Sequence, residues 1–160
     1  MILVTGGLGY LGGRIVSTLL KSGYQIRIGT SRTDAYIPEE LSVCEVVKVD
    51  LLDSENLYVA CQNVNLIIHL AAMNAQSCVA DPEQALLING LGTLNLINAA
   101  LKQNVKKILY FSTAHVYASP LRGEINENTL PKPTHPYSIT HRLAEDYVIE
   151  ANENNHIQGV

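Results

Sequence analysis

Short apolar segments alternate with longer segments of helical periodicity along the whole chain. The apolar segments, each expected to form a strand, are residues 2–4, 25–29, 45–49, 65–70 and 107–112. Apolar and β-branched residues dominate them without the regular alternation of a half-exposed strand, which is typical of parallel strands buried on both faces. Residues 156–160 look like the approach to a sixth strand that the chain does not complete.

The helices between these strands are marked by their spacing and by their ends. Apolar residues recur at helical spacing in residues 10–21, and Gly23 follows where a C-terminal cap belongs. Further helices are expected at residues 53–61, 81–103 and 137–152. Asp53 and Asp81 would cap the first two of these, because a carboxylate accepts hydrogen bonds from the free amides of a first helical turn.

This alternation of strands and helices predicts the fold class. Parallel strands joined by helices form one α/β domain, a doubly wound parallel sheet with helices on both faces. The expected strand order is 3-2-1-4-5. The 160 residues are long enough to bury a core without a disulfide or a metal ion.

Composition and charge exclude several classes of function. Apolar residues make up 47% of the chain and charged residues 16%, which favours a well-buried core and excludes intrinsic disorder. The net charge is −4 without any basic run, so we expect no binding to nucleic acid or to an anionic membrane through bulk charge. No apolar stretch approaches the roughly 18 residues of a membrane span, and the first residues lack the pattern of a secretory signal.

The cysteines and histidines predict neither disulfides nor a metal site. Cys44, Cys61 and Cys78 are odd in number and lack C-x-x-C spacing, so they support neither a disulfide framework nor a zinc site. No pair of histidines has the spacing of metal ligands. Together these features predict a cytoplasmic protein.

A glycine-rich turn carries the first chemical signal. Residues 5–12 read T-G-x-x-G-x-x-G, directly after the first strand and at the start of the first helix. Gly6 would permit the tight turn, Gly9 would let the main chain approach a pyrophosphate, and Gly12 would let the helix pack close to the strand. The pyrophosphate would then lie on the positive end of the helix dipole. The turn therefore predicts a Rossmann-type domain that binds a dinucleotide.

The end of the second strand bears on the choice of cofactor. Roughly 20 residues beyond the glycines, an acidic residue would bind the ribose 2′-hydroxyl of NAD. Here the chain reads Thr30-Ser31-Arg32, and a guanidinium beside hydroxyl groups favours the 2′-phosphate of NADP. Because Asp34 lies close by, NAD stays open as the alternative, as does a role for Arg32 as a merely solvated loop residue.

Six motifs in order resemble one family of enzymes. The glycine turn is followed by Asp50-Leu51, His69-Leu70-Ala71-Ala72, Asn89-x-x-Gly92-Thr93, Ser112-Thr113-x-x-Val116-Tyr117 and Pro136-Tyr137. In these motifs the chain resembles the extended short-chain dehydrogenases/reductases, and among them the NAD-dependent epimerase/dehydratase family. The resemblance implies an NAD(P)-dependent epimerase, dehydratase or reductase that acts on a nucleotide sugar or a similar hydroxyl or carbonyl compound.

The resemblance also implies roles for single residues. The cofactor-binding residues that it adds are Tyr10 and Leu11 in the pyrophosphate turn, Asp50 and Leu51 beside the adenine, Leu70, Ala71 and Ala72 under the cofactor, and Asn89, which would steady the adjacent strand. Thr113 would polarise the substrate and Tyr137 would be the acid/base. From the residues alone, Asp50 also fits an exposed acid at a strand end, and Asn89 fits a residue that satisfies backbone groups inside a helix.

One position departs from the family's pattern. The family has Tyr-x-x-x-Lys, whereas residues 137–141 place His141 one helical turn after Tyr137. In the family the lysine holds the nicotinamide ribose and lowers the tyrosine pKa, while a histidine is shorter and only partly protonated near neutral pH. Two hypotheses follow. Either His141 substitutes for the lysine in an enzyme, or the chain is a dinucleotide-binding module that senses redox state or serves as a scaffold, with little or no turnover.

The remaining expectations concern the rest of the protein. Residues 1–160 would form the NAD(P)-binding domain, and the substrate-binding part of longer family members would be absent, either in a fragment or in a truncated gene product. A homodimer would use the two helices through which the family commonly dimerises. The apolar residues expected on their shared face are Leu94, Ile97, Tyr137, Leu143 and Val148. Among the histidines, we expect His69 to be a packed, hydrogen-bonded side chain, and one interpretation of His115 places it in the substrate cleft.

Overall fold

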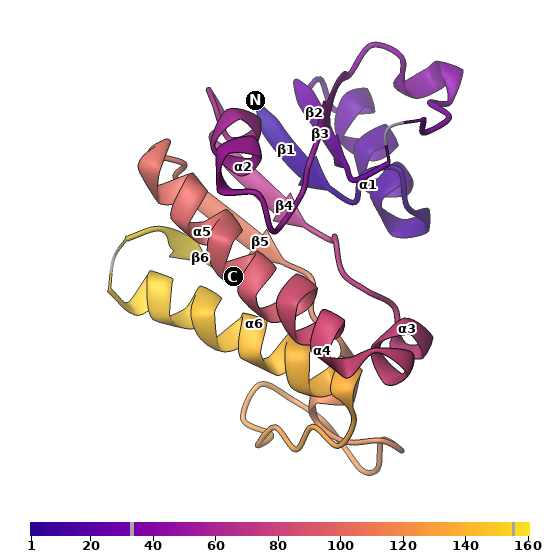
Figure 1. The fold of residues 1–160 in the computed structure, drawn as a ribbon, viewed down its shortest axis with the longest axis vertical. Coiled ribbons are helices and arrows are strands. Elements are labelled where there is room, and N and C mark those ends of the chain that lie inside the picture. The colour runs from indigo at the N-terminus through magenta and orange to yellow at the C-terminus, as the bar shows by residue number, and fades with distance from the viewer. Residues whose placement is uncertain (33, 155) are drawn as a thin grey trace.

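The domain is built on a parallel sheet of six strands. The computed structural model describes residues 1–32, 34–154 and 156–160 and shows the strand order β3-β2-β1-β4-β5-β6 (Figure 1). The strands are β1 (Ile2–Thr5), β2 (Ile26–Thr30), β3 (Glu45–Lys48), β4 (Leu66–His69), β5 (Lys107–Tyr110) and β6 (Gln158–Gly159). The predicted order of the first five strands is confirmed. The expectation of an uncompleted sixth strand is wrong, because Gln158 pairs with Lys107 and Gly159 with Ile108.

The connections between the strands are mostly helical. The helices are α1 (Tyr10–Lys21), α2 (Ser54–Ala60), α3 (Ala75–Ala80), α4 (Pro82–Ala85), α5 (Gly92–Lys102) and α6 (Pro136–Glu153), with 3₁₀ turns η1 (Glu39–Leu41) and η3 (Ala114–Val116). The helix predicted at residues 81–103 is present, but its middle, η2 (Leu86–Leu91), is a π-helical turn. Helix α3 is not among the predicted helices, and it begins where the Asn74 side chain accepts the Ser77 amide.

The predicted helix ends are confirmed. The Asp53 carboxylate accepts hydrogen bonds from the Glu55 and Asn56 amides at the start of α2. Asp81 does the same for the Gln84 amide at the start of α4. After α1 the chain turns through Gly23, whose φ of +82° is left-handed and favours glycine. Local side-chain chemistry therefore fixes where these helices begin and end.

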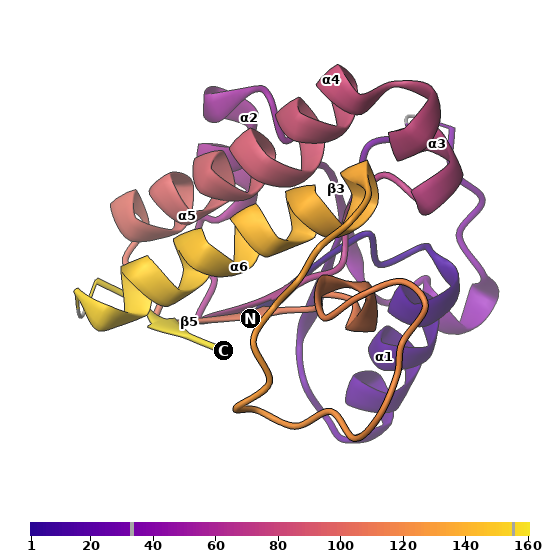
Figure 2. The same ribbon diagram turned by 90° about the horizontal axis from the view of Figure 1, so that it is seen from below.

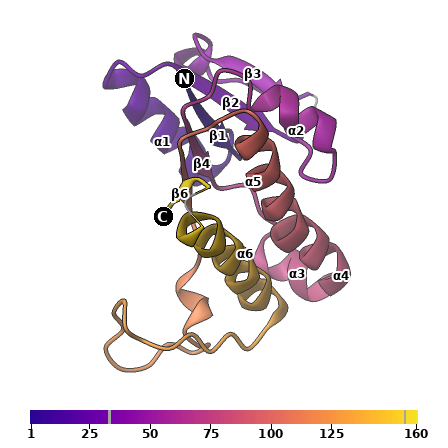
Figure 3. The ribbon, with the colours of Figure 1, turned by 90° about the vertical axis from the view of Figure 1, so that its left-hand side faces the viewer.

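Helices cover both faces of the sheet and enclose two cores. Figure 3 shows α1 on one face and α2, α5 and α6 on the other. Successive strand residues point to opposite faces. Val4 accordingly packs with Val16 of α1, whereas Leu3 packs with Leu96 of α5 in the other core.

A long loop joins η3 to α6. Residues 117–135 contain neither helix nor strand, and they run outside the sheet before α6 begins (Figure 2). The loop returns to its origin, because the Lys132 amide donates a 2.8 Å hydrogen bond to the Val116 carbonyl. This closure brings the start of α6 next to η3, although the two are far apart in the sequence.

The long helix corrects one expectation from the sequence. Its 21 residues, Pro82–Lys102, have a mean hydropathy of 1.2 over an 18-residue window, so by length and composition it meets the criteria for a membrane span. Half of that window is buried inside the domain, and the polar side chains of Asn89 and Thr93 are buried with it. Packing against the sheet and α6 therefore accounts for the apolar composition of this helix.

The apolar face expected for a dimer is partly internal. Ile97 is 2% exposed and Val148 is 3% exposed, and both belong to the core between α5, α6 and the sheet. These two residues therefore hold α5 and α6 on the sheet, and the expectation that they share an outward face is wrong.

The first turn of α1 lies directly against the turn that follows β1. A Cβ atom on Gly12 would lie 2.2 Å from the Gly6 carbonyl oxygen and 2.7 Å from Gly7 Cα. Gly6 has a φ of +68°, which other residues adopt only with strain. On Gly13 a Cβ atom would meet nothing closer than 3.9 Å. Residue 12 must therefore be glycine for the helix to approach the turn this closely.

We expect Gly12→Ala to lower the free energy of unfolding by about 1–3 kcal/mol, because the added methyl group would overlap backbone atoms of the turn. Gly13→Ala is the matched control. Its site is open and helical, so alanine should leave stability unchanged or raise it by up to about 1 kcal/mol. Urea denaturation followed by circular dichroism measures both changes. Equal effects of the two substitutions would contradict the close approach.

Candidate functional site

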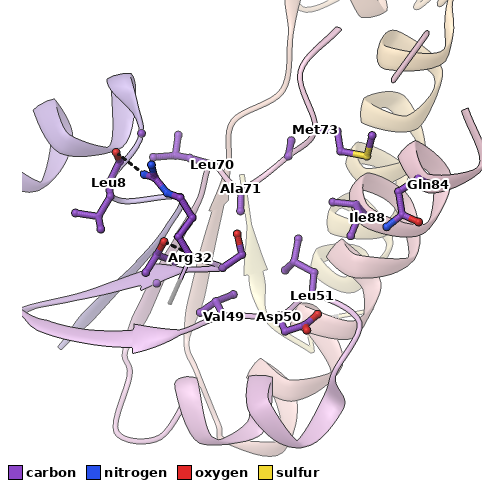
Figure 4. A pocket seen from close by; sticks show the side chains of 16 residues that line it. Leu8, Arg32, Val49, Asp50, Leu51, Leu70, Ala71, Met73, Gln84 and Ile88 are labelled. Carbon is purple, nitrogen blue, oxygen red and sulfur yellow. Dashed lines mark hydrogen bonds between the residues drawn. The ribbon is translucent and has the colours of Figure 1, made fainter. Parts of the chain in front are cut away.

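A cavity of about 570 Å³ opens at the carboxyl ends of the central strands (Figure 4). Its lining comes from the ends of β1, β2, β3 and β4 and from the long helix: Gly6, Leu8, Gly9, Gly29, Thr30, Ser31, Arg32, Val49, Asp50, Leu51, Leu70, Ala71, Ala72, Met73, Gln84 and Ile88. The chain order of the strands reverses between β1 and β4. Crevices at this point of an open α/β sheet are the usual ligand sites of such folds.

The glycine turn leaves amide groups free at one end of the cavity. Helix α1 starts after Gly9, which has no side chain to cap it. The Gly9 amide donates to the Gly6 carbonyl at 2.9 Å, and the Gly13 amide is the first to return to Gly9. Within the described residues, the intervening amides of the first turn have no backbone acceptor outside the helix. These amides and the helix dipole together can bind an anion such as a pyrophosphate.

Arg32 lies across the mouth of the cavity. Its amide donates to Thr30 Oγ1 at 3.2 Å, and its Nη2 donates to the Leu8 carbonyl at 3.3 Å (Figure 4). The guanidinium thus stands between the glycine turn and the end of β2. There it can meet an anionic group that extends from a bound ligand.

Asp50 and Leu51 form the opposite side of the cavity. The Asp50 amide donates to Asn56 Oδ1 at 2.7 Å, and the Asp50 carboxylate accepts the Leu52 amide at 3.0 Å. The turn after β3 is therefore held by its own side chain, and one carboxylate oxygen is used inside that turn. Asp50 is a half-buried acid just after β3, and it lines the cavity.

The floor of the cavity is the chain that follows β4. Leu70, Ala71 and Ala72 line it as a short extended stretch, and Met73 continues it. Asn89 lies behind this floor and is 1% exposed. Its Oδ1 accepts the Met73 amide at 2.8 Å, so Asn89 holds the floor from behind and is outside the lining.

Three other residues of the proposed cofactor set also lie outside the lining. Tyr10 is 82% exposed and has the Arg14 guanidinium over its ring at 4.7 Å. Leu11 is exposed beside it, and Gly12 is buried against Gly6. Of the glycine turn, it is Gly6, Leu8 and Gly9 that line the cavity.

Sequence reasoning missed several lining residues. Gly29 and Val49 stand at the ends of β2 and β3, so the rule that parallel strands present their carboxyl ends at one edge would have found them. Gln84 and Ile88 come from the long helix, and no local signal in the sequence marks them. Their place depends on how that helix crosses the sheet edge.

A second cluster of side chains surrounds Tyr137 near the start of α6. The Tyr137 ring lies 4.2 Å from the His141 ring, centroid to centroid, and 6.4 Å from the His115 ring. The His135 ring stacks parallel to it at 6.2 Å and 7°. His135 caps α6, because its Nδ1 accepts the Ser138 amide. The structure thus brings three imidazoles around one phenol.

Thr113 adjoins this second cluster through His115. It precedes η3, and its Oγ1 accepts the His115 amide at 3.3 Å. Thr113, Tyr137 and His141 do not line the described cavity. The cluster borders the cavity floor through Asn89, whose Nδ2 donates to Thr140 Oγ1 at 3.0 Å, within the same helical turn as Tyr137.

His141 is buried and hydrogen-bonded inside its own helix. It is 3% exposed, and its Nδ1 lies 2.9 Å from the Tyr137 carbonyl oxygen, which can only accept. Burial lowers the pKa of His141, and the bond to the Tyr137 carbonyl opposes this in part. The imidazole at this position is therefore less readily charged than an exposed histidine.

His69 is buried at the end of β4, as expected from the sequence. Its Nδ1 lies 2.7 Å from Thr5 Oγ1, and its Nε2 lies 3.1 Å from Thr93 Oγ1. Burial lowers the pKa of His69 to about 3, and the nearby His141 contributes in the same direction. The side chain is packed and both of its nitrogens are paired.

We expect His69 to make the protein less stable in acid. The pKa in the folded protein is about 3 against 6.5 for the free side chain, so the unfolded chain binds a proton that the folded protein excludes. The contribution of neutral His69 to the free energy of unfolding is therefore complete above pH 6.5, and it is lost as the pH falls toward 3. At about pH 5 the loss from this residue is about 2 kcal/mol.

Urea denaturation at about pH 7 and about pH 5 measures this loss. His69→Asn is expected to lose less stability between the two pH values than the unaltered protein. His141 acts in the same direction in both proteins, so their difference isolates His69. An identical loss in both proteins would contradict the assignment.

Comparison with known sequences identifies the family of this chain and several relatives. A sequence model of the NAD dependent epimerase/dehydratase family matches residues 2–160. The chain is 31% identical over 151 residues to a protein named putative UDP-glucose 4-epimerase from Methanocaldococcus jannaschii, covering 92% of this chain and 50% of that protein. It is 34% identical over 154 residues to UDP-glucose 4-epimerase from Bacillus subtilis, covering 90% of this chain and 45% of that protein.

The solved structures agree with the sequence comparison. UDP-glucose 4-epimerase from Thermus thermophilus, in complex with NAD, superimposes with a TM-score of 0.87 at 28% identity, covering 98% of this chain and 52% of that one. The present chain spans about half the length of the curated relatives that it matches.

Proposed function

This chain belongs to the NAD dependent epimerase/dehydratase family, and from that premise we propose that it is the cofactor-binding domain of an NAD(P)-dependent enzyme acting on a nucleotide sugar. Epimerisation, dehydration and reduction are the reaction types within this proposal. The observation that carries it is the cavity at the strand ends, onto which α1 directs uncapped amide groups. The NAD in the T. thermophilus epimerase and the similarity to proteins named as UDP-glucose 4-epimerases support it.

The residues of the cavity fit a dinucleotide. Its volume, about 570 Å³, lies in the range of pockets that hold cofactors. The first turn of α1 would hold the pyrophosphate, and Asp50 and Leu51 would lie beside the adenine. Leu70, Ala71 and Ala72 would lie under the cofactor. When bound, the nicotinamide would accept or donate a hydride.

The 2′-position of the adenosine ribose decides between NAD and NADP, and we propose a preference for NADP. Of the described residues at the end of β2, Thr30, Ser31 and Arg32 line the cavity, and Asp34 is not part of the lining. Arg32 spans the mouth and can pair with a 2′-phosphate. The NAD of the T. thermophilus relative favours the alternative, so the choice rests on Arg32.

We expect Arg32→Ala to weaken NADPH binding about tenfold and to leave NADH binding nearly unchanged, because only NADPH carries the phosphate. Fluorescence titration with both coenzymes measures the two dissociation constants. Arg122→Ala, in the exposed loop after η3, is the control for a general loss of positive charge. Equal weakening of both coenzymes would remove the NADP preference. If neither coenzyme binds the unaltered protein, the proposed function fails.

Thr113 and Tyr137 are the proposed acid/base pair. The oxidation of a substrate hydroxyl requires a group that takes its proton, and the Tyr137 oxygen would do so. The Thr113 oxygen already accepts the His115 amide, which leaves its own O–H to donate to the same substrate oxygen. His141 would support Tyr137 from one turn away. It holds the Tyr137 carbonyl but, when neutral, supplies no positive charge to stabilise a phenolate.

The burial of His141 favours a second candidate function. A neutral imidazole in place of the family's lysine fits a domain that binds a dinucleotide and turns over slowly or not at all, as in a redox sensor or a scaffold. Cofactor binding is common to both candidates. Only turnover separates them.

We expect His141→Lys to raise turnover at neutral pH about tenfold, because a permanent charge beside Tyr137 stabilises its deprotonated form. The assay separates the products that the complete protein forms from UDP-glucose and dTDP-glucose by chromatography, because epimerisation and dehydration return the nicotinamide to its starting oxidation state and leave no net change in its absorbance. Tyr137→Phe in the same background is the control and should remove the gain. If the coenzyme binds but neither the unaltered protein nor His141→Lys turns over, the binding module is the better description.

The rest of the assembly is also a proposal. We propose that residues 1–160 are the cofactor-binding domain and that residues outside them complete the substrate site, since the relatives are longer. A homodimer is proposed through η2 and α6, where Leu87, Leu91 and Ile139 are 40–50% exposed. The free cysteines support a cytoplasmic location.

A further inference from the structure

A chain of buried hydrogen bonds connects the cavity floor to the helix that carries Tyr137. Five polar side chains from β1, β4, η2, α5 and α6 form it, and each is at most 3% exposed: Thr5, His69, Asn89, Thr93 and Thr140. No charged group takes part in it. Its members come from two strands, the long helix and α6, so these hydrogen bonds tie the four elements to one another.

The chemistry of the donors and acceptors fixes the direction of the hydrogen bonds that run from Asn89 through Thr93 and His69 to Thr5. Thr93 Oγ1 lies 2.6 Å from the Asn89 carbonyl oxygen, which can only accept, so the Thr93 hydroxyl donates to it. The same oxygen must then accept from His69, whose Nε2 therefore carries the hydrogen. In a neutral imidazole the Nδ1 is then an acceptor, so the Thr5 hydroxyl donates to it.

Thr5 links the imidazole to the cavity floor. Its Oγ1 accepts the Ala71 amide at 3.3 Å and shares the Leu70 amide, at 3.2 Å, with the Thr5 carbonyl. The Thr5 hydroxyl donates its hydrogen to His69, and its lone pairs accept from these two amides, so it can form no further hydrogen bond. A proton added at His69 Nδ1 would find no acceptor there.

Asn89 carries the chain onward to α6. Its Oδ1 accepts the Met73 amide of the floor, and its Nδ2 donates to Thr140 Oγ1. The Thr140 hydroxyl in turn donates to the Tyr137 carbonyl at 3.2 Å. The Asn89 backbone carbonyl therefore connects to His69 through Thr93, and the Asn89 side chain joins the cavity floor to the helical turn that carries Tyr137.

We propose that His69, held in its Nε2–H tautomer, is a positioning residue that fixes the cavity floor relative to Tyr137 through Thr93 and Asn89. The inference rests on the proposed function, because the floor and Tyr137 matter together only if a cofactor and an acid/base meet there. Loss of any link leaves a buried polar group unpaired, which costs more than the bond itself contributes. The titratable groups facing His69 are His141 and Tyr110, and burial disfavours the ionised form of both.

The tautomer can be tested without any cofactor. In protein labelled with ¹⁵N-histidine, we expect the His69 signals of an Nε2–H imidazole, unchanged from about pH 7.5 to about pH 5. The signals are assigned by their loss in His69→Asn. An Nδ1–H tautomer, or protonation within this range, would overturn the inference.

The coupling is tested by removing one hydroxyl. Thr93→Val keeps the side chain's shape and breaks both of its bonds, so we expect the Met73 amide and the Tyr137 ring signals to shift together. NADH or NADPH affinity should fall about tenfold. Thr93→Ser restores the hydroxyl and should restore the signals. Thr18→Val is the control, because the Thr18 hydroxyl also bonds the carbonyl four residues earlier, at the far end of α1.

The outcomes separate this inference from the proposed function. Shifts confined to the immediate neighbours of Thr93, with Tyr137 unaffected, would overturn the positioning role even if the coenzyme binds. Failure of the unaltered protein to bind either coenzyme would overturn the proposed function, while the tautomer and the linked shifts would still decide the inference. If Thr93→Val does not fold, His69→Asn removes the imidazole that joins Thr5 to Thr93 and carries the same expectation for the Met73 amide and the Tyr137 ring.

Discussion

The close packing of α1 on the β1 turn is the constraint on which the site depends. The backbone of Gly12 lies so near the Gly6 carbonyl that no side chain fits between them. This approach places the start of α1, with its uncapped amides, at the point where the strand order reverses. If the helix stood farther out, the free amides would face solvent and the floor after β4 would lack an opposing wall.

Much of the framework could be predicted because its signals are local. Apolar runs, the caps Asp53 and Asp81, and the glycines of the first turn each act within a few residues. Strand β6 could not be judged in this way, because its pairing with β5 joins segments about fifty residues apart in the sequence. The π turn in the long helix, which packs against α6, has no sequence signal of its own.

The candidate site likewise contains residues that the sequence predicts and residues that only the structure identifies. Residues that follow directly from strand ends, such as Ser31, Arg32 and Asp50, do line the cavity. Asn89 acts through a contact that only the tertiary structure creates, because it holds the floor from behind. His135 caps α6 through Ser138, three residues on, so that contact is local, although the sequence analysis did not assign it. The sequence shows that His141 replaces a lysine. Only the fold shows that this histidine is buried and tied to the Tyr137 carbonyl.

The π turn at η2 has a consequence for how this helix can change in evolution. A π turn holds one residue more than an α-helical turn, and each residue rotates a helix by about 100°. Deleting a single residue from Leu86–Leu91 would make the helix regular. It would also swing everything upstream, including Gln84, around the axis relative to Thr93. The length of this helix is therefore constrained by the different directions that its two halves must face.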